Sequence, residues 1–322
     1  MHKFPLQLAL LGATLAITIG TTPVHAQATR TWVSGVGDDA NPCSRTAPCK
    51  TFAGAISKTA VSGEINCIDS GGFGAVTVTK AITISCEGVI AGVLTSGTNA
   101  ITVNAPGAVV VLKGLDIEGS GTGLAGINIL AAAVVQVHNC IIHDFNAGGG
   151  NGLGIRATPT VATRIDVANT IISNNGSAST GGGILVRPTG GGTVIGVISQ
   201  VQILNNNGNG LTVDGSASTG TQMELVLRDS VVAGNVSTGV AVTTAGGTPS
   251  RVAIDRSSVI GSATGITSTG SGADVTIGQS MVSANTTGMS FTAPAQLRSY
   301  QTNQIRGNIT DNGVPSSTIP QE

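Results

Sequence analysis

The residues best suited to proton transfer gather near the middle of the chain. His138, His143 and Asp144 lie close together, and Asp116 and Glu118 precede them by about one repeat. A histidine beside carboxylates can perform acid–base catalysis on a sugar. Because His138 and His143 are five positions apart with a turn between them, they need not share a face. We therefore interpret them as solvated or turn-bonding residues, and keep His138, His143 and Asp144 as catalytic candidates only.

A second group consists of two adjacent opposite charges that recur one repeat later, Arg228-Asp229 and Asp255-Arg256. Glycoside hydrolysis needs two carboxylates about 5–10 Å apart, and elimination from a uronic acid needs a base and neutralisation of the carboxylate. A strip formed by Arg228, Asp229, Asp255 and Arg256 could supply such groups. Exposed ion pairs give the same pattern, so the sequence assigns no catalytic residue.

The five cysteines predict disulfides instead of a metal centre. A metal site needs several ligands at one point, and no Cys-x-x-Cys motif occurs, so we expect no metal and no cofactor. Cys43 and Cys49 flank a Pro-bounded loop that a disulfide would close. Cys67 and Cys86 end two short strands of what could be adjacent coils, and are the second candidate pair. Cys140 is left over, and we expect it to fill space in the core.

The elements that carry these residues repeat with a period in the twenties. A glycine followed by an aliphatic residue recurs after steps of 28, 29, 27, 29, 26 and 23 residues. Period-two alternation between these marks indicates short, half-buried strands, and such a period indicates a solenoid. The marks are Gly126-Ile127, Gly154-Ile155, Gly183-Ile184, Gly210-Leu211, Gly239-Val240, Gly265-Ile266 and Gly288-Met289.

An asparagine recurs three residues after the second aliphatic residue of a repeated pair. Asparagine tolerates left-handed backbone angles, and its amide can bond to equivalent residues in neighbouring coils. We therefore predict a structural ladder in which Ala263 is the one break. Its members are Asn175, Asn207, Asn235, Asn285 and Asn308.

Two aliphatic residues followed by asparagine and then by glycine-aliphatic, over residues 126–313, resemble the pectate-lyase-like superfamily. The fold class is then all-β, a single-stranded right-handed parallel β-helix with a short N-terminal capping helix. Handedness is implied by the resemblance alone. The catalytic motifs of polygalacturonases, alginate epimerases and pectate lyases in this superfamily do not occur in the sequence.

The chain divides into four predicted segments. Residues 1–26 have a basic start, an apolar run and a small-residue cleavage site, so we expect a signal peptide. Residues 27–62 form a leader with a helix over Thr51–Ala60, which would cover the open end of the solenoid. This leader resembles the cap of secreted bacterial β-helix proteins of unassigned activity. Residues 63–313 form the β-helix, and residues 314–322 a flexible tail.

Composition limits the classes of partner that the protein is expected to bind. The formal net charge of −1 gives no electrostatic footprint for nucleic acid, and the predicted mature chain has no apolar run long enough to cross a bilayer. Aromatic residues, on which sugar rings stack, make up only 2% of the chain. We expect a secreted or periplasmic bacterial protein, associated with the cell surface, whose partner is a polysaccharide or another surface component. The favoured function is a non-catalytic adhesion-type module. The alternative is a polysaccharide lyase, hydrolase or epimerase of that superfamily.

Overall fold

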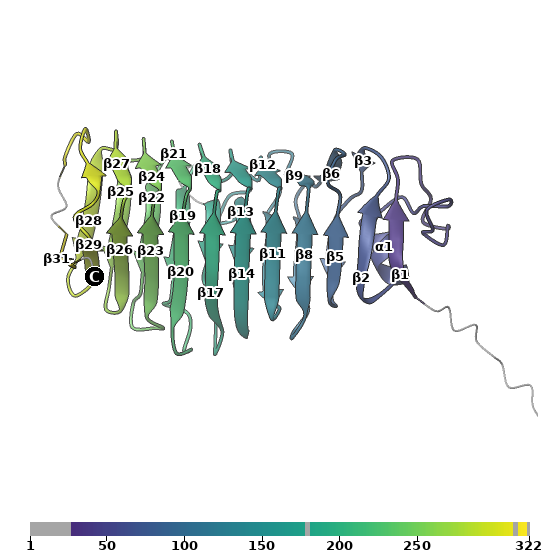
Figure 1. Cartoon of the computed structure of the whole chain (residues 1–322), viewed down its shortest axis with the longest axis horizontal. Helices are drawn as coiled ribbons and strands as arrows, with labels where there is room; N and C mark the ends of the chain where they lie inside the picture. Colours follow the sequence, from purple (N-terminus) through teal and green to yellow (C-terminus); the bar gives the residue numbers. More distant parts are fainter. Residues whose placement is uncertain (1–26, 178–180, 312–314, 321–322) are drawn as a thin grey trace, which may run out of the picture.

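Three parallel β-sheets run side by side along the whole molecule and enclose one core (Figure 1). The computed structural model describes residues 27–177, 181–311 and 315–320. In each coil the chain passes from sheet 1 to sheet 2, then to sheet 3, and back to sheet 1 of the next coil. We call the connections that leave sheets 1, 2 and 3 the first, second and third turns. The predicted parallel β-helix is confirmed.

Sheet 1 has twelve strands in the described residues and continues to the last coil. Its strands are β1 (Ala28–Val33), β2 (Thr59–Cys67), β5 (Ile82–Ser85), β8 (Val109–Lys113), β11 (Val134–His138), β14 (Ala162–Ala168), β17 (Thr193–Ser199), β20 (Met223–Arg228), β23 (Ser250–Asp255), β26 (Ala273–Gly278), β29 (Gln296–Ser299) and β31 (Ser317–Thr318).

Sheet 2 is narrow, because each of its described strands has only two to four residues. They are β3 (Gly71–Gly72), β6 (Ala91–Leu94), β9 (Leu115–Glu118), β12 (Ile141–His143), β15 (Ile171–Ser173), β18 (Gln202–Leu204), β21 (Val231–Ala233), β24 (Ser258–Ile260), β27 (Met281–Ser283) and β30 (Gln304–Ile305).

Sheet 3 ends at the edge strands β4 and β28. Its strands are β4 (Val76–Val78), β7 (Asn99–Asn104), β10 (Ala125–Ala131), β13 (Leu153–Ala157), β16 (Gly182–Val186), β19 (Asn209–Asp214), β22 (Thr238–Thr243), β25 (Thr264–Thr269) and β28 (Thr287–Thr292).

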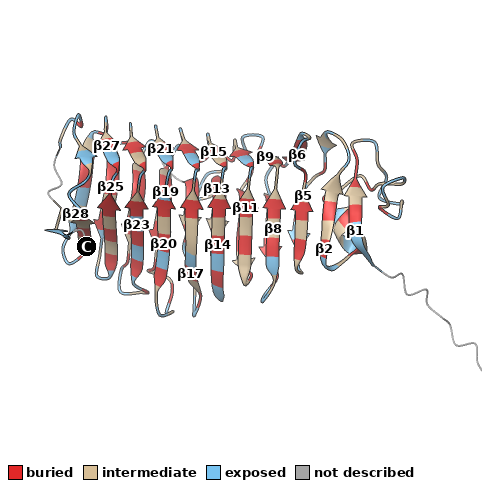
Figure 2. Ribbon diagram, in the orientation of Figure 1, coloured by how far each residue is buried: buried red, intermediate tan, exposed pale blue. Residues whose placement is uncertain are grey.

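Alternating burial explains why these segments are strands. In β5, Ile82 and Ile84 are buried and the two residues between and after them are half-buried, and the same banding recurs along the molecule (Figure 2). Each buried aliphatic side chain contributes about 1.5–3 kcal/mol. Register stacks aliphatic on aliphatic through eight strands of sheet 1, in the column Ile84, Leu112, Val137, Val167, Ile198, Leu227, Ile254 and Ile277.

The one helix of the described residues, α1 (Phe52–Lys58), lies at the N-terminal end of the solenoid (Figure 1). The Thr51 hydroxyl caps it by accepting a hydrogen bond from the Gly54 N–H at 2.9 Å. Phe52 is buried and its ring lies 5.2 Å from that of Phe73, so the helix covers the open end of the core. It ends two residues before the predicted limit at Ala60, because Thr59 and Ala60 already belong to β2.

The cysteines form two disulfides, Cys43–Cys49 and Cys67–Cys86. The second joins the end of β2 to the residue after β5, which is the next strand of sheet 1. Cys140 is a buried free thiol. Burial raises its pKa to about 11.

The second turn contains a ladder of buried asparagines, and one of the predicted members is wrong. Asn175 donates from Nδ2 to Oδ1 of Asn206 at 3.0 Å, and Asn206 donates likewise to Asn235 at 2.9 Å. Asn207 is instead exposed. The prediction slipped by one residue because Ile203, not Leu204, is the buried aliphatic that stacks on Ile172.

Farther along, Asn285 donates to Asn308 at 2.9 Å. The same slip misplaced the break in the ladder. Ser262, not Ala263, occupies this position, and its N–H donates to Oδ1 of Asn285 at 2.9 Å. Its buried hydroxyl has no hydrogen-bond partner in the described residues.

Two predicted boundaries also differ from the structure. The limit at residue 63 falls inside β2, and β1 of the leader already pairs with β2 in sheet 1. The predicted tail, 314–322, includes β31, which pairs with β29. The predicted signal peptide, 1–26, lies outside the described residues. Among the described helices there is none with the length and hydropathy needed to span a membrane.

We predict that Asn206→Ala destabilises the protein by about 1–3 kcal/mol, because the buried amide of Asn175 loses its acceptor. Asn207→Ala should cost much less, because that side chain is exposed and, among the described residues, donates only to the Gly176 carbonyl at 3.3 Å. Urea unfolding followed by circular dichroism would measure both. Equal losses from the two variants would contradict the corrected ladder.

Candidate functional site

The seven predicted catalytic candidates fall at two places along the molecule, one around β11 and β12 and the other around β20 and β23. His138 ends β11 on sheet 1, whereas His143 ends β12 on sheet 2, and Asn139 and Cys140 form the turn between them. The two histidines therefore lie on different faces and do not act together. Asp144 follows His143 directly. Arg228, Asp229, Asp255 and Arg256 lie farther toward the C-terminal end.

His143 is held between two carboxylates. Its Nε2 lies 3.0 Å from Oδ1 of Asp116, one coil away, and its Nδ1 lies 2.8 Å from Oδ2 of Asp144. Burial lowers the pKa of His143, but the hydrogen bonds and negative charge of Asp144 and Asp116 outweigh it, so the pKa is raised overall. Both ring nitrogens are engaged. The arrangement favours a bound imidazolium and leaves no free nitrogen to act as a base.

A hollow of about 380 Å³ lies beside this cluster. Glu87, Asp116 and Asn139 supply its polar groups, and Ile90 and Ile141 are exposed apolar residues on its wall. The Asn139 amide donates to Oε1 of Glu87 at 2.6 Å, which links coils two repeats apart. The hollow offers acceptor oxygens and an apolar surface, which suits a hydroxylated ligand.

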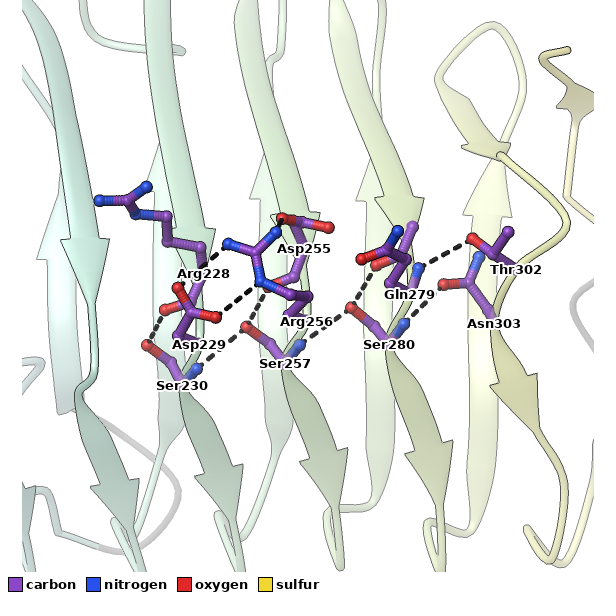
Figure 3. Close-up of polar contacts among 11 residues, drawn as sticks. Arg228, Asp229, Ser230, Asp255, Arg256, Ser257, Gln279, Ser280, Thr302 and Asn303 are labelled. Carbon is purple, nitrogen blue, oxygen red and sulfur yellow. Dashed lines mark hydrogen bonds and ion pairs between the residues drawn. The ribbon is translucent and has the colours of Figure 1, made fainter. Parts of the chain in front are cut away.

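The charged strip at the other end is brought together as predicted from its spacing (Figure 3). Arg228 and Asp255 are register partners at the ends of β20 and β23. Asp229 and Arg256 occupy the first turn with left-handed φ values of 50° and 45°. Arg256 makes a bidentate contact with Asp229 at 2.8 and 3.2 Å, and its Nη1 lies 2.5 Å from Asp255.

These contacts hold both partners in their charged forms. The hydrogen bond from Arg256 lowers the pKa of Asp229, and the same bond raises the pKa of Arg256. A general acid or base working near neutral pH needs a pKa shifted the opposite way. The charged side chains of the strip are therefore paired with one another, and the strip is poorly suited to proton transfer.

Beneath the strip, the first turn contains a ladder of hydroxyl groups that the sequence analysis missed. The N–H of Ser230 donates to Oγ of Ser257 at 3.2 Å, and the N–H of Ser257 donates to Oγ of Ser280 at 3.1 Å (Figure 3). Each hydroxyl in turn donates to the carbonyl two residues before it. In the sequence, this turn could have been recognised from a polar residue that recurs directly before the ladder position, in Asn139-Cys140, Asn169-Thr170 and Asp229-Ser230.

A polar hollow of about 270 Å³ adjoins the C-terminal end of the strip. Its side chains are hydroxyls, amides, one methionine and the guanidinium of Arg256. They suit hydrogen bonding to a neutral polar ligand. Within the described residues, no three His, Cys, Asp or Glu side chains are grouped to hold a metal ion.

We expect Ser257→Ala to destabilise the protein by about 1–3 kcal/mol, because the buried N–H of Ser230 loses its acceptor. Arg256→Gln should have a smaller effect, because exposed ion pairs contribute little. Chemical unfolding of both variants tests the order. A larger loss from Arg256→Gln would mean that the ion pair, not the hydroxyl ladder, holds this turn.

The His143 cluster predicts a stability that depends on pH. Because the folded-state pKa is raised above its ordinary value of 6.5, the stabilisation is fully present below about pH 6.5 and is lost as pH rises through the folded pKa. The variant Asp116→Asn/Asp144→Asn should lower the pKa of His143, as measured by nuclear magnetic resonance titration. It should also remove this part of the pH dependence of unfolding. An unchanged His143 pKa would contradict the role given to the carboxylates.

Two solved structures are similar to this one. The crystal structure of pectate lyase Pel9A aligns with a TM-score of 0.58 and 14% identity, over 89% of this chain and 81% of that one. The alginate lyase from Paenibacillus sp. str. FPU-7 aligns with a TM-score of 0.58 and 16% identity, over 87% and 97%. At such identities the likeness shows the fold alone. No curated protein matches the sequence.

A family profile described as "Right handed beta helix region" matches residues 91–282, more than half of the chain. This match agrees with the three parallel sheets and confirms the predicted handedness, and the two solved structures share the fold. The chain therefore belongs to the right-handed β-helix family.

Proposed function

We propose that this protein is an exported, non-catalytic β-helix that binds a polysaccharide or another cell-surface component along its outer faces. The observation that carries the proposal is the mutual neutralisation of the candidate catalytic groups. Arg256 forms ion pairs with Asp229 and Asp255, and Asp116 and Asp144 engage both nitrogens of His143. The pKa of Asp229 is lowered, away from the value that a general acid or base at neutral pH needs, and His143 has no unoccupied ring nitrogen to accept a proton.

The surface along the first turn supports a binding role. Two shallow hollows of about 380 and 270 Å³ lie at its two ends and offer amide, hydroxyl and carboxylate groups. Repetition of strands about 4.8 Å apart gives the faces the elongated form that an extended polymer can follow. Two disulfides support export, because such bonds persist in oxidising compartments.

The alternative is a polysaccharide-active enzyme, and the observation that favours it is the likeness to a pectate lyase and an alginate lyase. Fold alone does not carry an activity from one protein to another. One experiment separates the two functions.

The purified protein would be tested for retention on polyuronides and neutral glycans, and the same mixtures assayed for new reducing or unsaturated ends. We expect retention on at least one glycan without new ends. The matched variant Asp229→Asn/Asp255→Asn should then leave the polymers equally intact. New ends that vanish in this variant would overturn the proposal in favour of catalysis. Absence of retention on every glycan would overturn the polysaccharide as the partner.

A further inference from the structure

Sheet 3 has almost no charge, and its one arginine is electrically isolated. Among the residues of its nine strands only Arg156 and Asp214 are charged. Asp214 pairs with Arg187 at 3.3 Å. Arg156 has no ion pair among the described residues. A half-buried guanidinium without a carboxylate is unusual, because charges removed from water are normally paired.

Three neutral oxygens hold the Arg156 guanidinium. Its Nε donates to Oδ1 of Asn128 at 2.8 Å, Nη1 to Oδ1 of Asn151 at 3.0 Å, and Nη2 to Oδ1 of Asn99 at 3.1 Å. These bonds fix the orientation of the group but leave its positive charge uncompensated. Burial accordingly lowers the pKa of Arg156, and no nearby acid raises it.

The side chain lies across the strands and extends toward the N-terminal end. Arg156 is on β13, whereas Asn128 is its register partner on β10 and Asn99 begins β7, one strand farther. Register continues the outer row from Asn128 to Thr102 and then to Thr77 on β4. The guanidinium therefore lies on the same face as these threonines.

This row leads into a hollow of about 420 Å³ between α1 and sheet 3. Asn99 lines the hollow and also binds Arg156, so the two features are contiguous. Ala53 and Ile56 of α1 form the apolar side, and Thr77 and Thr102 lie on the side of the sheet.

The polar groups available at this place are mainly donors. The guanidinium has five N–H groups, and three of them donate to asparagine oxygens. The amide nitrogens of Asn99 and Asn128 make no hydrogen bond with other described residues, and the same holds for the hydroxyls of Thr77 and Thr102. Donors around an uncompensated cation, with no carboxylate beside them, suit an oxyanion.

We propose that Arg156, with Asn99 and Asn128, binds the oxyanion of a hydroxylated, sugar-sized ligand whose body occupies the hollow between α1 and sheet 3. The anionic group is a carboxylate or a sulfate ester, since both present planar or trigonal oxygens to a guanidinium fork. This site is separate from the first turn, and its test does not depend on whether the protein binds a polymer or cleaves one.

The test is calorimetric titration of the full chain with glucuronate, glucose 6-sulfate and glucose at low salt. We expect one or both anionic sugars to bind and glucose to bind at least tenfold more weakly, with binding that weakens as salt increases. Arg156→Gln should abolish the preference for the anion, and Arg156→Lys should retain part of it. The control Arg251→Gln removes the same charge from an exposed side chain of sheet 1, and should leave binding unchanged.

Thr77→Tyr tests the place of the ligand's body, because it fills the hollow without altering any contact of Arg156. It should weaken binding of the anionic sugar. Circular dichroism and thermal unfolding would verify that each variant is folded. The proposal is overturned if none of the sugars binds, if glucose binds as well as the anions, or if Arg156→Gln and Arg251→Gln have equal effects. Unchanged binding in folded Thr77→Tyr would overturn the occupancy of the hollow.

Discussion

The structure depends on parallel pairing that keeps one register from coil to coil. Sheet 1 shows no register shift from β5 to β29. Each residue therefore lies about 4.8 Å from its counterpart in the next coil. Equivalent residues of successive coils form a column along the solenoid, and side chains of one kind tend to recur in it. Aliphatic columns make the core. Columns of asparagine and serine satisfy the buried backbone at the second and first turns, which would otherwise carry unpaired N–H groups.

The same constraint governs the charges on the surface. At a spacing near 4.8 Å, like charges in one column repel and opposite charges pair. Arg256 thus meets Asp229 of the preceding coil, and Arg298, the register partner of Thr276, reaches diagonally to Asp274 at 3.1 Å. The pairing of Arg256 with Asp229 stabilises the ionised forms of both side chains. Ionisable groups in a stack of coils therefore tend to form ion pairs with one another. A proton-transfer site would need an ionisable group that has no opposite charge in the neighbouring coil.

Much of the fold could be predicted because its signals are local and periodic. The glycine-aliphatic marks identify the coils, Thr51 identifies the start of the capping helix, and the cysteine spacing indicates both disulfides. The position of the asparagine ladder could not be predicted from the sequence in the same way. Ile203-Leu204 offers two aliphatic residues, and only the register of β18 on β15 shows that Ile203 is the buried one. Asn206 and Asn207 are then indistinguishable from their sequence.

The sites depend on contacts that no local pattern encodes. The hydroxyl ladder escaped notice because its column begins with Cys140, Thr170 and Val201, which share no obvious chemistry. Arg156 and Asn99 are 57 positions apart, and the intervening coils differ in length, so their contact follows only from the register of two strand pairs.

Arg156 and Arg256 show why such contacts decide function. Both are arginines on outer faces of the same solenoid, yet Arg256 meets two carboxylates whereas Arg156 meets three amide oxygens. Amide dipoles orient a guanidinium without cancelling its charge, and burial reduces the access of water that would screen it. Of the two, only Arg156 retains electrostatic free energy that a ligand from outside could use. At Arg156 the neighbouring coils supply no opposite charge, so we expect the solenoid to bind the negatively charged group of a ligand there.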